Sequence, residues 1–298
     1  MRLGQCKRII VNVASDVSQN HVFSFAAALS YYFVLAFFPA LIALATTVGY
    51  LPIPNLFNTI VEAMARVMPP QSTGLLLRVA ADVTSRNHPA LLSFGLLGVL
   101  WTCSSGFATM IEALNVAYNV PETRSALKTR LLAVALTFLI GILVIIAFTF
   151  IILGPLLGNF LAARIGLSWV FGVTWPILRH VFAGIFIVLA VEALYFLAPD
   201  IKHSFGSSLP GAIFSVIGWM LLSDGLSLYF QRFAHLNRTY GVLGGGVALL
   251  VWLYWSSFVT LLGAELNSEI LQLRGDAGLV LKQPTAPEAR SKAAITTG

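Results

Sequence analysis

Long uninterrupted apolar segments dominate the hydrophobic pattern of this 298-residue chain. A helix needs about 20 mainly apolar residues to cross the hydrocarbon core of a bilayer. Six segments meet this requirement, and proline or glycine punctuates several of their ends. We therefore expect six transmembrane helices, at about residues 23–50, 90–111, 131–153, 177–198, 208–230 and 242–264.

The fold class that follows is all-α: a polytopic membrane helix bundle with six transmembrane helices. Its orientation can be predicted from the connections, because cytoplasmic loops carry an excess of Lys and Arg. With the amino terminus inside, 11 of the 18 Lys and Arg residues fall on the cytoplasmic side and the other seven outside. An even number of spans then predicts that both the amino and the carboxyl terminus are cytoplasmic.

The remaining segments have patterns of their own. Residues 1–21 predict a cytoplasmic helix on the membrane interface, because apolar side chains recur there at helical spacing beside charged ones; they are Cys6, Ile9, Ile10, Val13 and Val17. The outer connection 51–89 holds two amphipathic segments separated by a proline pair, which predicts two outer helices. Residues 272–298 lack periodicity and read as a cytoplasmic disordered tail. The transmembrane domain is therefore residues 22–271.

Composition agrees with a membrane protein. Hydrophobic residues make up 58% of the chain and charged residues 10%, against roughly 25% charged residues in soluble domains. A net charge of +6 also occurs in nucleic-acid-binding proteins, but in a membrane protein it sets topology. The first apolar segment is longer than the roughly 7–15 residues of the apolar region of a signal peptide, so we expect it to be retained. Cys6 and Cys103 have neither disulfide nor metal-ligand spacing.

Small and polar residues share one face of the second predicted span. They recur at steps of three and four: Gly95, Gly98, Thr102, Ser105, Thr109 and Glu112. Small residues let membrane helices approach closely, so packing explains the pattern. The functional alternative is a polar track that ends at an inner carboxylate. The fifth span has a similar face, for which packing is favoured, at Ser208, Gly211, Ser215 and Gly218.

Acidic residues occur inside or beside the apolar segments. Glu192 and Asp224 lie within the fourth and fifth spans, and buried acids in a membrane mark ion or substrate pathways. The alternative is a protonated or interfacial acid at a misplaced boundary. Glu265 and Glu269 lie one turn apart after the sixth span. We expect their counter-charges on the same side of the membrane, at Arg124, Lys128 and Arg130.

A second polar face of the sixth span lies apart from these acids. It consists of Ser256, Thr260, Gly263 and Asn267. Motifs of soluble enzymes do not occur in the sequence, and the five histidines are scattered over different segments. We therefore expect no enzyme activity, no catalytic residues, no cofactor, no metal site and no nucleic-acid partner. A nuclease would need an aqueous site with carboxylates and bases, and no segment provides one.

The sequence resembles the YihY/BrkB family of bacterial inner-membrane proteins, formerly labelled ribonuclease BN. The resemblance covers roughly residues 20–275. Its most specific blocks are Ala26–Tyr32, Phe38–Pro39, Tyr240–Gly245, Trp252–Tyr254 and Gly263–Asn267, and weaker ones are Ala113–Tyr118 and Leu209–Ala212. Gly246 departs from the family pattern, in which we expect a larger apolar residue. The resemblance implies a six-helix inner-membrane protein linked to envelope integrity, with lipid-like substrates and no agreed catalytic residues.

These observations lead to a functional hypothesis. We predict a transporter or flippase-like protein for a lipid-like or small solute, in the bacterial inner membrane and in contact with membrane lipids. Its pathway or helix network would consist of Thr102, Ser105, Glu112, Glu192, Asp224, Glu265 and Asn267. The alternative is a non-transporting membrane scaffold for envelope proteins. The sequence indicates neither a substrate nor an oligomeric state.

Overall fold

The computed structural model describes residues 3–49, 89–152, 154, 168–232 and 242–274, with single residues at 60, 62, 64, 68, 72 and 74. Its long elements in these ranges are all α-helices. They are α1 (Leu3–Gln19), α2 (Val22–Gly49), α5 (Pro89–Ala117), α6 (Ala126–Ile152), α8 (Ser168–Leu197), α9 (Leu209–Arg232) and α11 (Val242–Arg274). The all-α prediction is confirmed.

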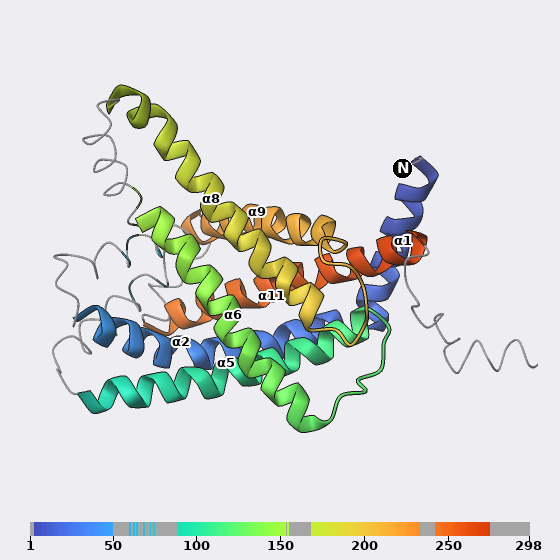
Figure 1. Cartoon of the computed structure of the whole chain (residues 1–298), viewed down its shortest axis with the longest axis horizontal. Coiled ribbons are helices and arrows are strands. Elements are labelled where there is room, and N and C mark those ends of the chain that lie inside the picture. Colours follow the sequence, from blue (N-terminus) through green and yellow to red (C-terminus); the bar gives the residue numbers. More distant parts are fainter. Residues whose placement is uncertain are drawn as a thin grey trace, which may run out of the picture.

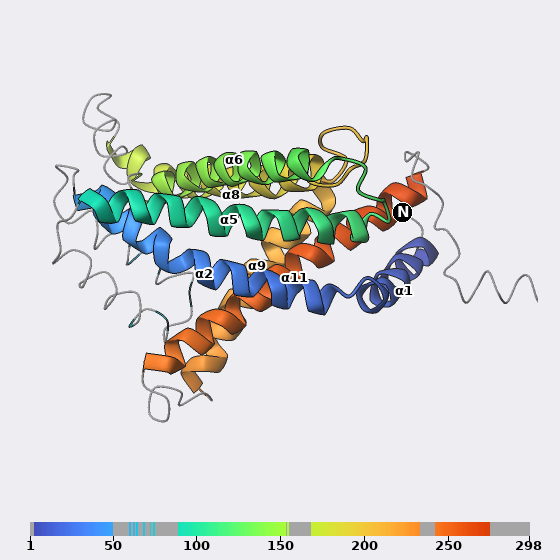
Figure 2. The ribbon, with the colours of Figure 1, turned by 90° about the horizontal axis from the view of Figure 1, so that it is seen from below.

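Six of these helices are long and apolar enough to cross a membrane: α2, α5, α6, α8, α9 and α11. The six-span prediction is therefore confirmed. In the two views of the ribbon, α1 lies at one end of the bundle beside the last turns of α11 (Figures 1 and 2). We call this end the α1 side and the other end the opposite side. The predicted cytoplasmic location of the α1 side stays a prediction.

The helix α11 is the centre of the bundle. It packs against α1, α2, α5 and α9, whereas α6 packs mainly against α8 and α5. Figure 2 shows α6 and α8 together along one edge, with α5 next to them, and the paired helices α9 and α11 reach the opposite edge. The helix α8 also packs directly against α9. The buried apolar core gathers towards the α1 side, around Leu29, Ile111, Leu114, Leu136 and Leu261.

Two short breaks on the α1 side are made by single residues with left-handed backbone. His21 has φ of 53° and separates α1 from α2, and its carbonyl accepts hydrogen bonds from Ser24 and Phe25. Asn119 has φ of 56° just after α5, and the Val120 N–H bonds back to the Asn115 carbonyl. Asparagine tolerates this conformation and commonly ends helices in this way. Local sequence therefore sets where α5 stops.

Glycines allow close helix contacts at two places. A Cβ atom on Gly95 would lie 3.1 Å from the Ala43 nitrogen, and one on Gly98 would lie 3.1 Å from Cβ of Pro39. The packing interpretation of this face is confirmed for both glycines. A Cβ atom on Gly211 would overlap the Gly263 carbonyl oxygen, so α9 and α11 nearly touch there. Small residues drive such contacts in membranes.

Several predicted boundaries were wrong in detail. The last helix continues to Arg274, ten residues beyond the expected end, because its polar extension packs against α1 and the start of α9. In α1, Ile9 and Val17 are buried, but Ile10 is 69% exposed. One face of α1 therefore packs against α11, and the face that carries Ile10 is exposed. The predicted outer helices within 51–89, except for six single residues, and the predicted tail after residue 274 lie outside the described residues.

The contact between α9 and α11 should tolerate no side chain at Gly263. A Cβ atom there would overlap Ser215 Oγ and lie 2.7 Å from the Gly211 carbonyl oxygen. We expect Gly263→Ala to lower the free energy of unfolding by about 1–3 kcal/mol through overpacking. Thermal unfolding of the purified protein in detergent measures this change.

The matched control is Gly246→Ala in the same helix, where an added Cβ meets no atom within 4 Å. Replacing glycine by alanine in a helix there should leave stability unchanged or raise it by up to about 1 kcal/mol. Equal melting temperatures for the two variants would contradict the close contact between α9 and α11.

Candidate functional site

A cavity of about 520 Å³ lies inside the bundle. Side chains of all six spanning helices line it, and we call it the central cavity. Its largest lining residues are aromatic: Phe33, Phe37, Phe107, Phe148, Trp219 and Trp252. Among the described residues that line the cavity, none is charged, and only four carry a hydroxyl group. The cavity therefore offers an apolar surface with a few neutral hydrogen-bonding groups.

Three of the four hydroxyl groups bond within the protein. Ser256 donates to the Trp252 carbonyl at 2.7 Å, and Thr260 donates to the Ser256 carbonyl at 2.9 Å. Such bonds to the carbonyl four residues earlier satisfy a hydroxyl inside its own helix. Ser215 Oγ lies 2.7 Å from the Tyr195 hydroxyl. The buried Ser257 Oγ has no hydrogen-bond partner in the described part of the chain.

On the α1 side, buried hydrogen-bonding groups close the central cavity. Tyr195 donates to the Thr260 carbonyl and contacts Ser215, while Tyr118 Oη lies 3.4 Å from Ser208 Oγ. His203 Nε2 lies 3.1 Å from the same Ser208 oxygen. Both tyrosines are fully buried. We call Tyr118, Tyr195, Ser208 and Ser215, with Asn267, the polar layer.

Asn267, a residue of α11 in the polar layer, binds the start of α9. Its Oδ1 accepts the Gly211 N–H at 2.7 Å, and its Nδ2 donates to the Ser208 carbonyl at 2.7 Å. The first N–H groups of a helix have no partner within it, so the side chain caps the start of α9 from a neighbouring helix. The side chain is fully buried. The structure thus places this predicted residue in a bridge between two helices.

Two predicted acids are buried on the α1 side. Glu192 is fully buried, and its Oε1 accepts the Gly206 N–H at 2.8 Å. Its Oε2 has no partner among the described residues. Glu265 is also fully buried and accepts a hydrogen bond from Asn20 at 2.8 Å. Neither carboxyl group lines the central cavity. Both lie on the α1 side of the bundle.

The counter-charges expected for Glu265 and Glu269 have other partners. Glu269 accepts a hydrogen bond from Asn12 of α1 at 2.8 Å, so an asparagine binds each of the two acids. Arg124 binds Glu122. Arg130 lies 5.2 Å from the centre of the Trp101 ring and donates to Ser105 at 3.3 Å, and Lys128 is exposed. The predicted pairing was wrong for both arginines, because the extension of α11 turns its acids towards α1.

The other predicted pathway residues lie away from the cavity. Glu112 and Asp224 are exposed on α5 and α9. Thr102 donates to the Gly98 carbonyl at 2.7 Å and Ser105 to the Trp101 carbonyl at 2.8 Å, so both hydroxyls are satisfied within α5. None of these four residues lines the central cavity. The sequence reasoning did not find Tyr195 or Ser257, although both belong to apolar spans with polar neighbours.

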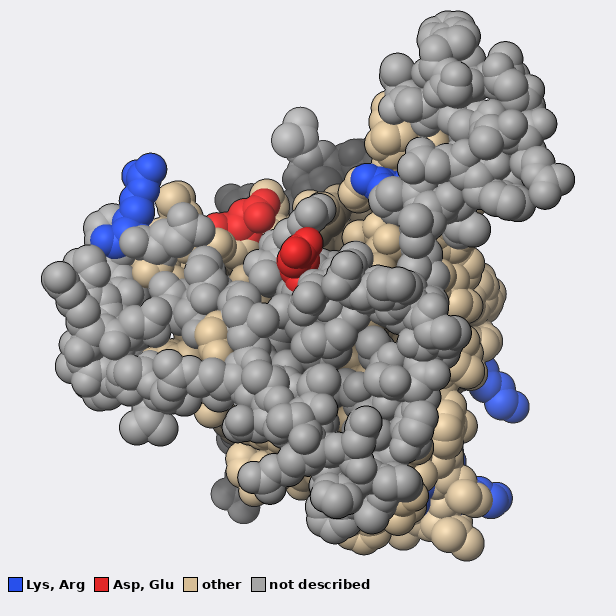
Figure 3. All heavy atoms as spheres, turned by 90° about the vertical axis from the view of Figure 1, so that its left-hand side faces the viewer, with Lys and Arg blue, Asp and Glu red and all other residues tan. Residues whose placement is uncertain are grey.

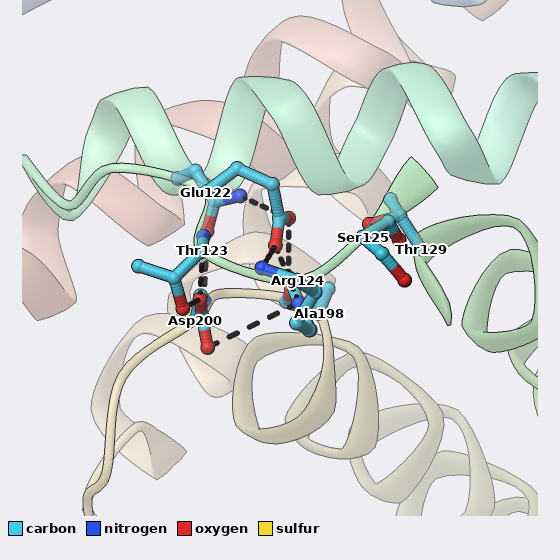
Figure 4. Close-up of polar contacts among 8 residues, drawn as sticks. Glu122, Thr123, Arg124, Ser125, Thr129, Ala198 and Asp200 are labelled. Atoms are coloured by element: carbon cyan, nitrogen blue, oxygen red, sulfur yellow. Dashed lines mark hydrogen bonds and ion pairs between the residues drawn. The ribbon is translucent and has the colours of Figure 1, made fainter. Parts of the chain in front are cut away.

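A second polar cluster joins two loops on the α1 side (Figure 4). The Arg124 guanidinium donates to both oxygens of the Glu122 carboxylate at 2.7 Å and to the Ala198 carbonyl at 2.8 Å. That carbonyl follows the end of α8, where a cation is favourable for the helix dipole. These hydrogen bonds lower the pKa of Glu122 and raise that of Arg124.

Asp200 completes this cluster, which we call the loop clamp. The Thr123 hydroxyl and N–H both donate to Asp200 Oδ2, at 2.5 and 2.9 Å, and these bonds lower the pKa of Asp200. Asn115 accepts the Asp200 N–H at 2.7 Å and donates to Glu122 at 2.8 Å. The loop after α5 is thereby fastened to the loop after α8.

At its far end, the central cavity is bounded by the connection after α2. Met64 and Met68 contribute to its lining, and Ser72 donates to the Gly245 carbonyl near the start of α11 at 3.1 Å. Figure 3 shows the face of the opposite side, where described acidic side chains lie near the middle and described Lys and Arg side chains lie at the margin. Charges thus occur on this face and not along the cavity.

Six apolar spanning helices around an apolar cavity define this chain as a polytopic α-helical membrane protein. The model of one protein family, described as Virulence factor BrkB, matches residues 13–289. The chain therefore belongs to the BrkB family, and the resemblance seen in the sequence is confirmed. No solved structure matches the chain.

Relatives from several bacteria cover most of the chain. A Bacillus subtilis protein named as the ribonuclease-like protein YfkH is 31% identical over 243 residues, which is 82% of this chain and 88% of the relative. A UPF0761 membrane protein of Cronobacter sakazakii is 23% identical over 92% of this chain and 91% of its own. The UPF0761 membrane protein Nmul_A0452 of Nitrosospira multiformis is 24% identical over 86% of this chain, which spans 59% of that relative.

The bridge made by Asn267 should contribute measurably to stability. In Asn267→Ala, the Gly211 N–H and the Ser208 carbonyl lose their partner inside the bundle. We expect a loss of about 1–3 kcal/mol in unfolding free energy, measured by thermal unfolding in detergent. Ser256→Ala is the control, because its hydroxyl bonds only within α11. A melting temperature for Asn267→Ala equal to that of the control would argue against the bridge.

The loop clamp predicts a pH dependence. The folded-state pKa values of Glu122 and Asp200 are lowered, so their stabilisation is present above the unfolded values, near 4, and is lost as pH falls through the folded values. Asp200→Asn should lower stability at pH 7 by about 1 kcal/mol or less, since the clamp is partly exposed.

The deficit of Asp200→Asn should shrink as the pH is lowered towards 3, because the wild-type carboxylate becomes protonated. Unfolding curves at several pH values test this, with Glu112→Gln, a change at an exposed acid of α5, as the control. If the deficit of Asp200→Asn were the same at every pH, the clamp would not depend on the charge of Asp200.

Proposed function

We propose that this protein is a transporter that moves a lipid-like molecule through the membrane, with the central cavity as its binding site. The observation that carries the proposal is an apolar cavity of about 520 Å³ lined by side chains of six spanning helices. Sites for small organic ligands have volumes of roughly 300–1,000 Å³. An empty apolar cavity destabilises a fold in proportion to its volume, which favours a cavity that a ligand fills.

The lining favours a lipid-like molecule over a small polar solute. An ion or polar solute inside a membrane protein needs charged or numerous polar partners. The described lining offers four hydroxyls, three of which are already bonded. Hydrocarbon, in contrast, needs only apolar contact, which phenylalanine, tryptophan and aliphatic side chains provide along the walls. The proposed cargo is therefore mainly apolar.

The polar layer is the proposed gate. It closes the α1 side of the central cavity, whereas the cavity extends towards the opposite side as far as Met64 and Met68. Transporters alternate between states that are closed on one side or the other of a central site. Few hydrogen bonds hold the layer, chiefly those of Tyr195 and Asn267, so a movement of the start of α9 would open it.

The proposed setting is the inner membrane of a bacterium, with a contribution to envelope integrity. The proposed activity is movement of a molecule and not a chemical reaction. A ribonuclease would need acid, base or metal-binding groups around an aqueous site, and the described cavity lining is uncharged. The name of the Bacillus subtilis relative is therefore not extended to this chain.

One observation favours the alternative of a membrane scaffold. Asp224 is exposed on α9 within the span Leu209–Phe230. A carboxylate facing lipid is unfavourable, and a partner protein that covers it with hydrogen-bond donors would remove this penalty. Crosslinking in native membranes through a cysteine at position 221, beside it on the exposed face, would reveal such a partner.

Filling the central cavity should stop transport. In Ala190→Phe, a ring replaces a small buried side chain of the cavity wall on α8. Liposomes with wild-type protein should move uncharged fluorescent glycolipid analogues between leaflets faster than protein-free liposomes, and Ala190→Phe should return the rate to the protein-free value. Bleaching of the outer leaflet by a membrane-impermeant reductant measures the rate.

The matched control is Ile185→Phe on the same helix, where the side chain is 47% exposed and does not line the cavity. This variant should transport like the wild type. No acceleration by the wild type for any lipid analogue, or equal rates for the two phenylalanine variants, would rule out transport through the central cavity.

A further inference from the structure

Ser257 differs from the other hydroxyl residues that line the central cavity. Its side chain is 3% exposed, and its Oγ has no hydrogen-bond partner in the described parts of the chain. Its neighbours Ser256 and Thr260 donate to carbonyls of their own helix. Buried hydroxyl groups are normally hydrogen-bonded, and one that is not indicates a missing partner. Because Ser257 lines the cavity, a bound ligand can supply that partner.

The cavity follows α11 over several turns and has a polar end. Its lining on α11 runs from Leu249 to Thr260, which is about 16 Å at the helical rise of 1.5 Å per residue. The four hydroxyl residues lie nearer the α1 side, and the rings of Phe37, Phe148 and other residues line the rest. Half of a bilayer's hydrocarbon core is about 15 Å thick. The cavity therefore matches the length of one lipid chain.

Charge is the second property that restricts the ligand. The described lining holds no Lys, Arg, His, Asp or Glu, so a phosphate or ammonium group inside the cavity would find no counter-ion. On the α1 side, the polar layer adds the hydroxyls of Tyr195 and Tyr118, and the nearby Glu192 and His203 side chains do not line the cavity. Burying an uncompensated charge is strongly unfavourable. Hydroxyl and ester groups, in contrast, can bond to serine.

We infer that the central cavity binds an uncharged lipid with a single hydrocarbon chain in the apolar part and a hydroxyl or ester group hydrogen-bonded to Ser257. The inference deepens the proposed function, on which it rests for the role of the cavity, by naming the class of its ligand. Monoacylglycerol represents this class, because it joins one chain to an uncharged group of hydroxyls and an ester. Lysophosphatidylglycerol carries the same chain with a negative phosphate.

Tryptophan fluorescence gives a direct measure of binding, because Trp219 and Trp252 line the cavity. A monoacylglycerol with a brominated chain should quench the purified wild-type protein saturably in detergent. Replacing both tryptophans by phenylalanine should remove the saturable part. Ser257→Ala should weaken the apparent affinity about three- to tenfold, the loss expected for one neutral hydrogen bond. Ser104→Ala is the matched control and should bind like the wild type, since this buried serine of α5 does not line the cavity and its hydroxyl donates to the Trp101 carbonyl.

The charged comparator completes the test. Lysophosphatidylglycerol with the same brominated chain should show no saturable quenching that depends on Trp219 and Trp252. Equal binding of both lipids, or equal affinities of Ser257→Ala and Ser104→Ala, would overturn the inference. Ala190→Phe should abolish saturable binding by filling the cavity, and binding that survives this change would also overturn it.

These experiments test the binding of the ligand and the transport activity separately. Saturable monoacylglycerol binding without lipid movement in liposomes would retain this inference and reject the proposed function. Lipid movement that Ala190→Phe stops, without monoacylglycerol binding, would retain transport and reject the assigned ligand class.

Discussion

The arrangement of the bundle depends on the contact between α9 and α11 at Gly211 and Gly263. The two backbones lie so close that a Cβ atom on either glycine would overlap the other helix or its side chains. Asn267 bonds across the same contact and satisfies polar groups at the start of α9. In lipid, apolar surface does not drive helices together, so close packing and hydrogen bonds must do so. This contact sets the position of Ser215 and thereby of the polar layer.

Further polar contacts on the α1 side link other helices to the α9–α11 pair. Tyr195 of α8 reaches the α9–α11 pair through Ser215 and the Thr260 carbonyl, and the loop clamp holds the end of α8 through Arg124. Asn12 and Asn20 bind the acids of α11 from the α1 segment. Many of the polar bonds between described residues thus lie on the α1 side. At the level of the central cavity, the side chains that face one another are mostly apolar, and a space remains between the helices.

The spans could be predicted from the sequence because hydrophobicity over about 20 residues is a local property. The site could be predicted only in part. Helical spacing correctly grouped Ser256, Thr260 and Asn267, but it cannot say what a face is turned towards. The four acids predicted for the pathway differ for this reason in the structure: Glu112 and Asp224 are exposed, whereas Glu192 and Glu265 are buried. The central cavity has no local signal, since its lining comes from six helices that are far apart in the chain.

The position of the polar layer beside an apolar cavity has a physical consequence for movement. An apolar wall makes no directional bonds, so a chain can slide along it without breaking any interaction. Each bond of the polar layer, in contrast, must break or find a new partner when helices separate, and a buried unpaired group is unfavourable. A ligand that carries its own hydroxyl or ester groups can offer such partners as it passes Ser215 and Tyr195. An uncharged polar end therefore suits both the proposed hydrogen bond to Ser257 and the proposed opening of the polar layer.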